Sequence, residues 1–172
     1  MVYSHRRCHS TTLGHPGSHV PSTGRTSRSK GHYLDITGEI EVFEFNHDLD
    51  EQARQARVML CPGVGFEIIP TDCLAAALQA ALPDATHLAL GFDSCSGISP
   101  GTAKTIVEGF AQGGRVRRDG RIVSVPPACR TRRIDFGDGE KLAMTIPWGD
   151  VATAWYSTGI ANIEVYRPAP ET

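Results

Sequence analysis

Short apolar runs alternate with amphipathic segments from His32 onward. The runs His32–Ile36 and Val58–Cys61 predict strands, and the second is expected to be buried. Between them, Glu39–Arg57 is polar with a sparse apolar face, which predicts a helix. The face consists of Ile40, Phe43, Ala53 and Ala56.

A second helix is predicted to begin at Pro70 or Thr71 and to end before Pro83. Its apolar side chains recur at three and four residues, so one stripe of the helix is expected to face a core. The segment Thr86–Asp93 alternates well enough to predict the next strand. The helical stripe consists of Leu74, Ala75, Leu78, Ala81 and Leu82.

Two hairpins are predicted in the last third of the chain, around Asp119-Gly120 and around Gly137–Glu140. A short helix and a final strand follow them. The hairpin strands are Arg115–Arg118, Arg121–Val125, Arg132–Phe136 and Lys141–Ile146, the helix is Val151–Ser157, and the last strand is Asn162–Tyr166.

The order of these elements predicts an α/β fold in which the tail of a parallel sheet runs into a mostly antiparallel α+β part. We divide the chain into a leader (residues 1–31), a parallel-sheet remnant (32–82) and an α+β part (83–172).

Residues 1–31 differ in composition from the rest. They carry five basic and no acidic residues, whereas 12 basic and 19 acidic residues follow. Their scattered apolar residues cannot offset the entropy of ordering, so we expect disorder. A metal site of His and Cys and an organelle presequence are two alternatives, but no recognised ligand spacing and no amphipathic face support them. The abrupt change also suggests a leader translated out of frame.

The composition excludes several classes of protein. The net charge of −2 gives no reason to expect nucleic acid as a partner, and no apolar run is long enough to span a membrane. The five cysteines are odd in number and form no CxxC pair. We therefore expect no disulfide framework and no metal site, but reduced and mostly buried thiols in a cytoplasmic protein.

Ser99 invites two functional interpretations. Gly97–Gly101 matches the G-x-S-x-G pattern of hydrolase nucleophiles, yet the residue after the serine is Pro100, which has no N–H for an oxyanion. A helix beginning at Ser99 and ending at Gly113 explains the pattern better. Such a helix end can bind phosphate or carboxylate through Ser99, Gly101 and Thr102, and the alternative is a solvated, merely capped end.

The segment Pro62–Phe66 follows a strand, as phosphate-binding loops do. Position 68 is Ile68, so the glycine pattern of a dinucleotide fingerprint is incomplete. A simple bend is the alternative, although ligands commonly bind at strand ends of open α/β sheets. Asp72 falls in a first helical turn, where an acid is also expected on electrostatic grounds alone.

Five blocks of the sequence, taken in order, resemble the saccharopine dehydrogenase-like oxidoreductases. The likeness is strongest to bacterial members, which include trans-acting enoyl reductases of lipid synthesis. Each block is weak by itself, and the order of all five makes the resemblance specific. The blocks are Gly31–Glu39, Pro62–Asp72, Gly97–Gly109, Thr145–Asp150 and Ser157–Tyr166.

The resemblance implies a Rossmann-type sheet, a second α/β substrate domain, and NAD or NADP between them. It also implies a small or lipid-like substrate. Two departures stand out: Glu67 replaces an aspartate of the family pattern, and the half that carries the glycine-rich dinucleotide turn is missing. The implied cofactor residues are Thr37, Gly38, Glu39, Gly63, Gly65 and Phe66, and the implied substrate residues are Asp72, Ser99, Gly101 and Thr102.

Two functions therefore remain. The chain is a fragment of an oxidoreductase that transfers hydride, or it is an inactive truncation that acts as a self-associating or protein-interaction module. An unpaired sheet edge, which readily pairs with another chain, is the basis for the second expectation.

Overall fold

The computed structural model describes residues 31–93 and 113–169, which belong to two compact units divided between Ile69 and Pro70. The sequence placed a boundary later, after Leu82. The division falls earlier because helix α4 (Ile69–Ala81) packs through Ala75 into the core of the second unit.

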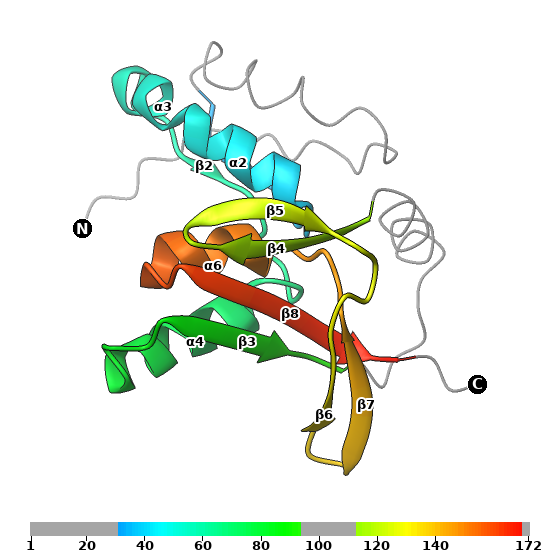
Figure 1. The fold of residues 1–172 in the computed structure, drawn as a ribbon. Helices are drawn as coiled ribbons and strands as arrows, with labels where there is room; N and C mark the ends of the chain where they lie inside the picture. The colour runs from blue at the N-terminus through cyan, green and yellow to red at the C-terminus, as the bar shows by residue number, and fades with distance from the viewer. Residues whose placement is uncertain (1–30, 94–112, 170–172) are drawn as a thin grey trace. The chain divides into compact units, whose positions relative to one another are not determined.

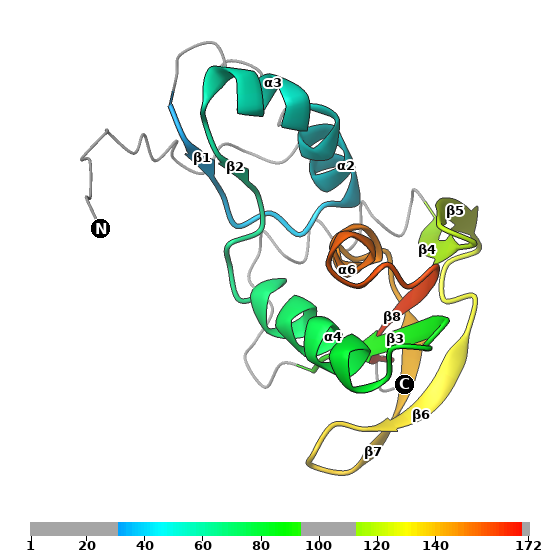
Figure 2. The same cartoon turned by 90° about the vertical axis from the view of Figure 1, so that its left-hand side faces the viewer.

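The first unit is a strand–helix–helix–strand arrangement. Strand β1 (Tyr33–Leu34) and strand β2 (Leu60–Cys61) lie side by side and run parallel, as Figure 2 shows. Helices α2 (Ile40–Asp48) and α3 (Asp50–Ala56) connect them. The single helix expected over this segment is thus broken at Leu49, whose ψ of 1° departs from helical geometry.

The core of the first unit is small. Ile40 and Phe43 of α2 and Ala53 of α3 are buried, as the sequence predicted. The expectation of a buried strand at Val58–Cys61 is wrong, since Leu60 and Cys61 are only half-buried and Met59 is 47% exposed. The described part of this unit contains only two parallel strands. Such a small sheet buries little apolar surface, and this explains why its second strand is only half-buried.

The second unit is a mostly antiparallel sheet of six strands. Its central strand is β8 (Asn162–Pro168), in the order β5-β4-β8-β7-β6. Strand β3 (His87–Gly91) pairs with β8 in parallel, from His87 opposite Asn162 to Gly91 opposite Tyr166. The remaining strands are β4 (Gly114–Arg118), β5 (Arg121–Val125), β6 (Thr131–Asp135) and β7 (Glu140–Thr145).

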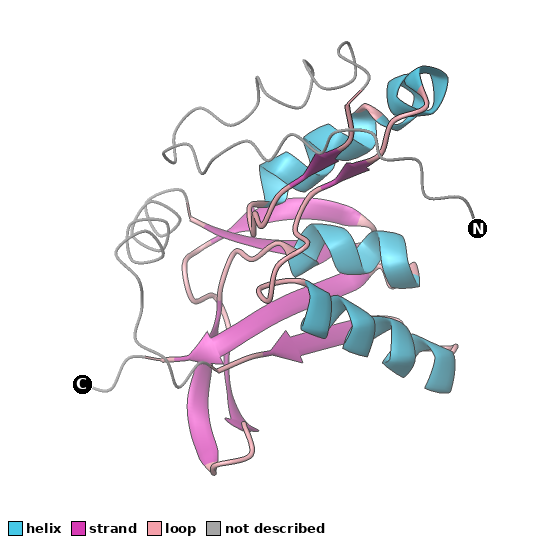
Figure 3. Cartoon of the chain, turned by 180° about the vertical axis from the view of Figure 1, so that it is seen from behind, coloured by secondary structure: helices cyan, strands magenta, loops and turns pink. Residues whose placement is uncertain are grey.

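Helices α4 and α6 (Asp150–Thr158) cover one face of this sheet (Figures 1 and 3). The core between the helices and the sheet joins Ala75, Ala154 and Ile163 with leucines of β3. Mixed α/β structure with four helices and a mainly antiparallel sheet is therefore what the described residues show.

Both predicted hairpins are confirmed. Asp119 and Gly120 turn β4 into β5 with φ values of 49° and 76°, which is the left-handed geometry that an Asp-Gly pair favours. Gly137 and Gly139 likewise have positive φ between β6 and β7. The predicted helix and last strand are confirmed as α6 and β8.

The apolar stripe of α4 lies differently from the prediction. Only Ala75 is buried, whereas Leu74, Leu78 and Leu82 are 53%, 39% and 60% exposed. The contact with β3 and α6 is made by the small alanine, because Ala75 lies fully inside the core cluster. The helix is confirmed, and of the stripe that was predicted to face a core only Ala75 is buried.

Two expectations lie outside the described residues. One is the disorder expected for residues 1–31, of which only residue 31 is described. The other is the helix at Ser99 with its anion site. No helix in the described ranges has both the length and the apolar character to cross a bilayer.

Candidate functional site

Asp35 connects two of the loops that the sequence singled out. Its Oδ1 accepts hydrogen bonds from the N–H groups of Thr37 at 3.0 Å and Gly63 at 2.9 Å. Its carbonyl accepts the N–H of Val64 at 2.8 Å, and the Tyr33 hydroxyl donates to Oδ2. The ends of β1 and β2 are thus fixed to each other through one carboxylate.

Gly63 is required by packing in this loop. Its φ is +72°, and a Cβ atom there would lie 2.6 Å from the Phe43 ring. Gly65 is tighter than usual as well, since its Cβ would lie 3.1 Å from Ile36. The glycines that suggested a phosphate loop are therefore explained by the close approach of the chain to its own side chains.

The other predicted cofactor residues lie beside these loops. The N–H of Glu39 donates to the Thr37 hydroxyl at 3.2 Å, and Glu39 precedes α2 without a side-chain cap. Gly38 lies between them. Phe66 is 83% exposed, so its ring is available to a ligand.

The described loops do not fit the diphosphate of NAD or NADP. Three N–H groups at the strand ends, those of Thr37, Gly63 and Val64, already donate to Asp35. A diphosphate cradle needs such groups free and pointing at the ligand. The exposed Phe66 ring remains suited to stacking on a flat heterocycle.

A pair of carboxyl groups forms the most unusual polar arrangement of the second unit. The Thr71 hydroxyl donates to Asp150 Oδ1 at 2.5 Å, and the Ser157 hydroxyl donates to Asp72 Oδ2 at 2.7 Å. Asp72 lies in the first turn of α4, and Asp150 is the first residue of α6. The first turn of α4 therefore places Thr71 against the first residue of α6 and Asp72 against its last turn. The positive end of its own helix dipole favours each acid.

Asp150 is fully buried. Burial, together with the negative charge of Asp72, raises the pKa of Asp150 to about 7, although the Thr71 hydrogen bond opposes the shift. Asp150 Oδ2 and Asp72 Oδ1 are buried and have no hydrogen-bond partner in the part of the chain that is described. Such a site holds a proton near neutral pH.

The sequence found only part of this arrangement. Asp72 was predicted as a substrate residue, whereas Asp150, Thr71 and Ser157 were not singled out. A signal was present, because Asp150 ends one resembling block and Ser157 begins another. The structure brings three blocks together at these side chains. Asp35 was likewise missed, although it lies inside the first block.

The remaining predicted substrate residues, Ser99, Gly101 and Thr102, lie outside the described ranges. Among the residues that are described, no group of three or more His, Cys, Asp or Glu side chains could hold a metal ion. Cys61 and Cys129 are half-buried free thiols, and Cys73 is exposed, which corrects the expectation of mostly buried cysteines.

No protein-family model matches the chain, and no curated protein matches it.

Proposed function

We propose that the chain is part of a cytoplasmic nicotinamide-dependent oxidoreductase of the saccharopine dehydrogenase-like group. The reaction would move hydride between NAD or NADP and a small or lipid-like substrate. The observation that carries the proposal is the meeting of the resembling blocks. Thr71 and Asp72 of the second block contact Asp150 of the fourth and Ser157 of the fifth.

These contacts support the proposal because nothing in local structure requires them. Asp72 and Ser157 lie far apart in the sequence, and each is polar and able to form bonds elsewhere. Fixed polar contacts between distant segments are typical of sites that position a ligand. A structural ion or proton site is the competing explanation of such contacts.

In this proposal the first unit is the tail of a Rossmann-type sheet. Its strand–helix–strand order and parallel pairing support that assignment. The second unit is the substrate domain, in which Ser99, Gly101 and Thr102 would hold an anionic group. Because the diphosphate does not fit the described loops, no part of hydride transfer is assigned to their residues.

The proton chemistry is assigned to the second unit. Reduction of a carbonyl, imine or enoyl group by hydride also requires a proton, and a group with a pKa near neutrality is best suited to exchange it. Asp150 has that property and would give its proton to the substrate, and the negative charge of Asp72 helps to keep Asp150 protonated beforehand. Thr71 and Ser157 hold the two carboxyl groups in place.

Nuclear magnetic resonance of the ¹⁵N-labelled chain with NADPH tests the cofactor assignment. We expect weak, millimolar binding, with shifts confined to Thr37–Glu39 and Gly63–Phe66, because the diphosphate lacks its donors. Phe66→Ala should remove these shifts, and Tyr156→Ala, which changes another exposed aromatic residue, should keep them. Absence of shifts in both loops at millimolar NADPH would exclude a cofactor site there.

A second candidate function is self-association, which the exposed face of α4 favours. Leu74, Leu78 and, just after the helix, Leu82 are exposed on one face, and α4 has no charged residue after Asp72 to oppose contact. An apolar face of this kind on two copies of one chain can pair around a twofold axis. We propose that a second copy of this chain covers the exposed face of α4.

Sedimentation of the chain across a range of concentrations tests the association. A dimer is expected that Leu74→Glu with Leu78→Glu converts to monomer. The matched control is Leu142→Glu, which places the same charge on an exposed leucine of β7. A monomer at every concentration, or a dimer indifferent to the α4 variant, excludes this candidate.

A further inference from the structure

A cleft of about 580 Å³ opens between the end of β3 and the β6–β7 hairpin, away from the carboxyl pair. This volume is in the range of small-molecule sites. Its β3 side is formed by Ala89 and Gly91, and the small size of Gly91 lets Phe136 and Ile134 approach the strand. A Cβ atom on Gly91 would lie 3.4 Å from the Phe136 ring and 3.5 Å from Ile134.

The walls of the cleft combine apolar residues with four charged side chains, which are Asp93, Arg132, Asp135 and Asp138. Phe136 and Ile134 line it from the β6 side, and Phe92 lines it from the β3 side. Phe92 is fixed by its contact with Trp148, with ring centroids 5.0 Å apart. Aromatic rings that are fixed beside the small residues of a strand can bind a flat or apolar group.

The acidic groups of the cleft are engaged within the protein. The Lys141 ammonium lies 2.6 Å from Asp93 and 2.7 Å from Asp138, so one cation bridges two carboxylates. Asp135 Oδ1 accepts the N–H groups of Gly137 and Gly139 in the hairpin turn. Each of these carboxylates therefore already has a partner within the protein, either the Lys141 ammonium or backbone N–H groups.

Arg132 is the polar group that remains available. Its guanidinium lies 5.2 Å from the centre of the Tyr166 ring, and within the described ranges it forms no ion pair with a carboxylate. Burial raises the pKa of Tyr166 to about 12, so the ring beneath the guanidinium stays neutral. A stacked guanidinium keeps its N–H groups in one plane, which suits a carboxylate.

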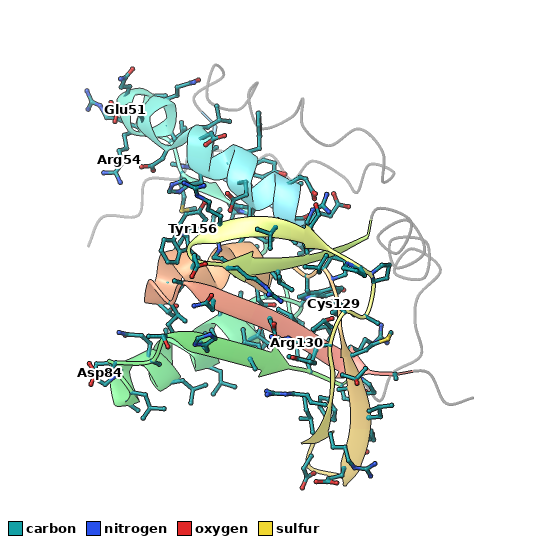
Figure 4. All side chains as sticks on the ribbon, viewed as in Figure 1. Glu51, Arg54, Asp84, Cys129, Arg130 and Tyr156 are labelled. Carbon is teal, nitrogen blue, oxygen red and sulfur yellow. The ribbon has the colours of Figure 1, made fainter. Side chains whose placement is uncertain are left out.

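The surface around Tyr166 is also positively charged. Arg130 and Arg118 lie 3.3 and 3.8 Å from Glu164, which is the acceptor of the Tyr166 hydroxyl. Figure 4 shows Arg130 beside β8. Two guanidinium groups thus lie near the Glu164 carboxylate, and Arg132 adds a third positive charge over the Tyr166 ring, an excess that attracts anions.

We propose that this cleft binds an organic carboxylate, with its apolar body against the Phe92 and Phe136 rings and its carboxylate on Arg132. The inference does not depend on the proposed oxidoreductase function, because it involves neither the carboxyl pair nor the loops of the first unit. Inorganic phosphate shares the charge but has no apolar body to occupy the walls.

The test is a titration of the ¹⁵N-labelled chain with 3-phenylpropionate, followed by the amide signals of Gly91, Phe136 and Gly137. Two probes serve as comparisons: 3-phenylpropionamide, which has the same body without charge, and inorganic phosphate, which has charge without the body. The carboxylate should bind about tenfold more tightly than either, because a charge-assisted pair contributes that much.

Arg132→Gln should remove the preference for the carboxylate over the amide while leaving weak binding of both. Arg133→Gln is the matched control, because Arg133 is the next residue of β6, faces the other side of the strand and pairs with Glu140. Gly91→Leu should weaken binding of both phenyl probes by filling the cleft. Gly91 has no positive φ, so this change introduces no backbone strain.

Three results would overturn the inference. The first is an absence of shifts at Gly91 and Phe136 with 3-phenylpropionate. The second is an Arg132→Gln chain that prefers the carboxylate over the amide as strongly as the original chain does. The third is phosphate binding as tight as that of the carboxylate, which would indicate a simple surface anion site.

Discussion

Asp150 places a carboxyl group where its charge is unfavourable. The side chain is fully buried, and among the described residues Asp72 is a neighbouring negative charge and Thr71 donates a side-chain hydrogen bond. The folded protein therefore holds a proton on Asp150 over a pH range in which the unfolded chain has lost it. That difference links the protonation of one residue to stability.

The pH dependence of unfolding follows from this linkage. Because the folded pKa is about 7 and the ordinary value is 3.8, the native state binds more protons than the unfolded state between these values. The free energy of unfolding should therefore fall as pH rises from about 4 to about 7, by roughly 1 kcal/mol per pH unit, and then level off. Urea unfolding followed by tryptophan fluorescence measures it.

Asp150→Asn should abolish most of this slope and be the more stable chain at pH 8. Asp72→Asn is the matched control: it removes the like charge and keeps the burial, so it should reduce the slope only in part. A slope identical in the original chain and in Asp150→Asn would show that Asp150 is ionised throughout.

Gly63 gives a second prediction for a single residue. In Gly63→Ala the new methyl group would meet the Phe43 ring, and φ would stay at +72°. Amide hydrogen exchange at Tyr33, whose N–H bonds to Met59, should become faster by an amount equivalent to about 2 kcal/mol or more.

Gly159→Ala separates the two causes. Gly159 has a φ of +71° and nothing within 4 Å of a Cβ, so only the backbone strain remains. A loss of about 1 kcal/mol is expected near that helix end. An equal cost at both positions would show that the Phe43 contact relaxes freely.

At the scale of elements, α4 shows how a helix can bury its smallest residues. Ala75 meets the core, and the leucines on the same helix are exposed. Ala75→Leu should destabilise the second unit by about 1–3 kcal/mol, because the core has no room for the added atoms. Leu78→Gln should change stability by no more than about 0.5 kcal/mol.

Denaturant unfolding at low protein concentration, where association does not contribute, compares the two variants. If Leu78→Gln proved the more damaging, the leucine stripe would be the buried face, as the sequence pattern suggested.

The elements that local chemistry specifies were predicted well. Asp119-Gly120 dictates a tight turn by itself, and β4 and β5 follow from the residues on each side. The residue of α4 that meets the core could not be predicted. Leucines and alanines both recur at the helical spacing, and the spacing alone does not show which of them is buried. The pair formed by Asp72 and Asp150 could not be predicted either, because it depends on how two distant helices meet on the sheet.

At the scale of the whole molecule, two units of different stability share one chain. The first has two short parallel strands, which are marginal alone, and the second has six strands and two covering helices. Trp148 and Trp155 both belong to the second unit. Far-ultraviolet circular dichroism should therefore begin to change at lower urea concentration than tryptophan fluorescence does.

Coincident curves from the two signals would indicate a single cooperative unit and would contradict this prediction. Hydrogen exchange should also distinguish the two units. The strongest protection is expected at Ile163 and Val165 of β8, which are fully buried, and weaker protection is expected in β1 and β2.

The central position of β8 also has a consequence for biosynthesis. This strand pairs with β3, β4 and β7, yet it follows all three of them in the chain and leaves the ribosome after them. Until Asn162–Pro168 emerges, each earlier strand has an unpaired edge in the nascent chain. The growing polypeptide must therefore wait with the edges of β3, β4 and β7 exposed, and the synthesis of β8 decides whether the sheet forms.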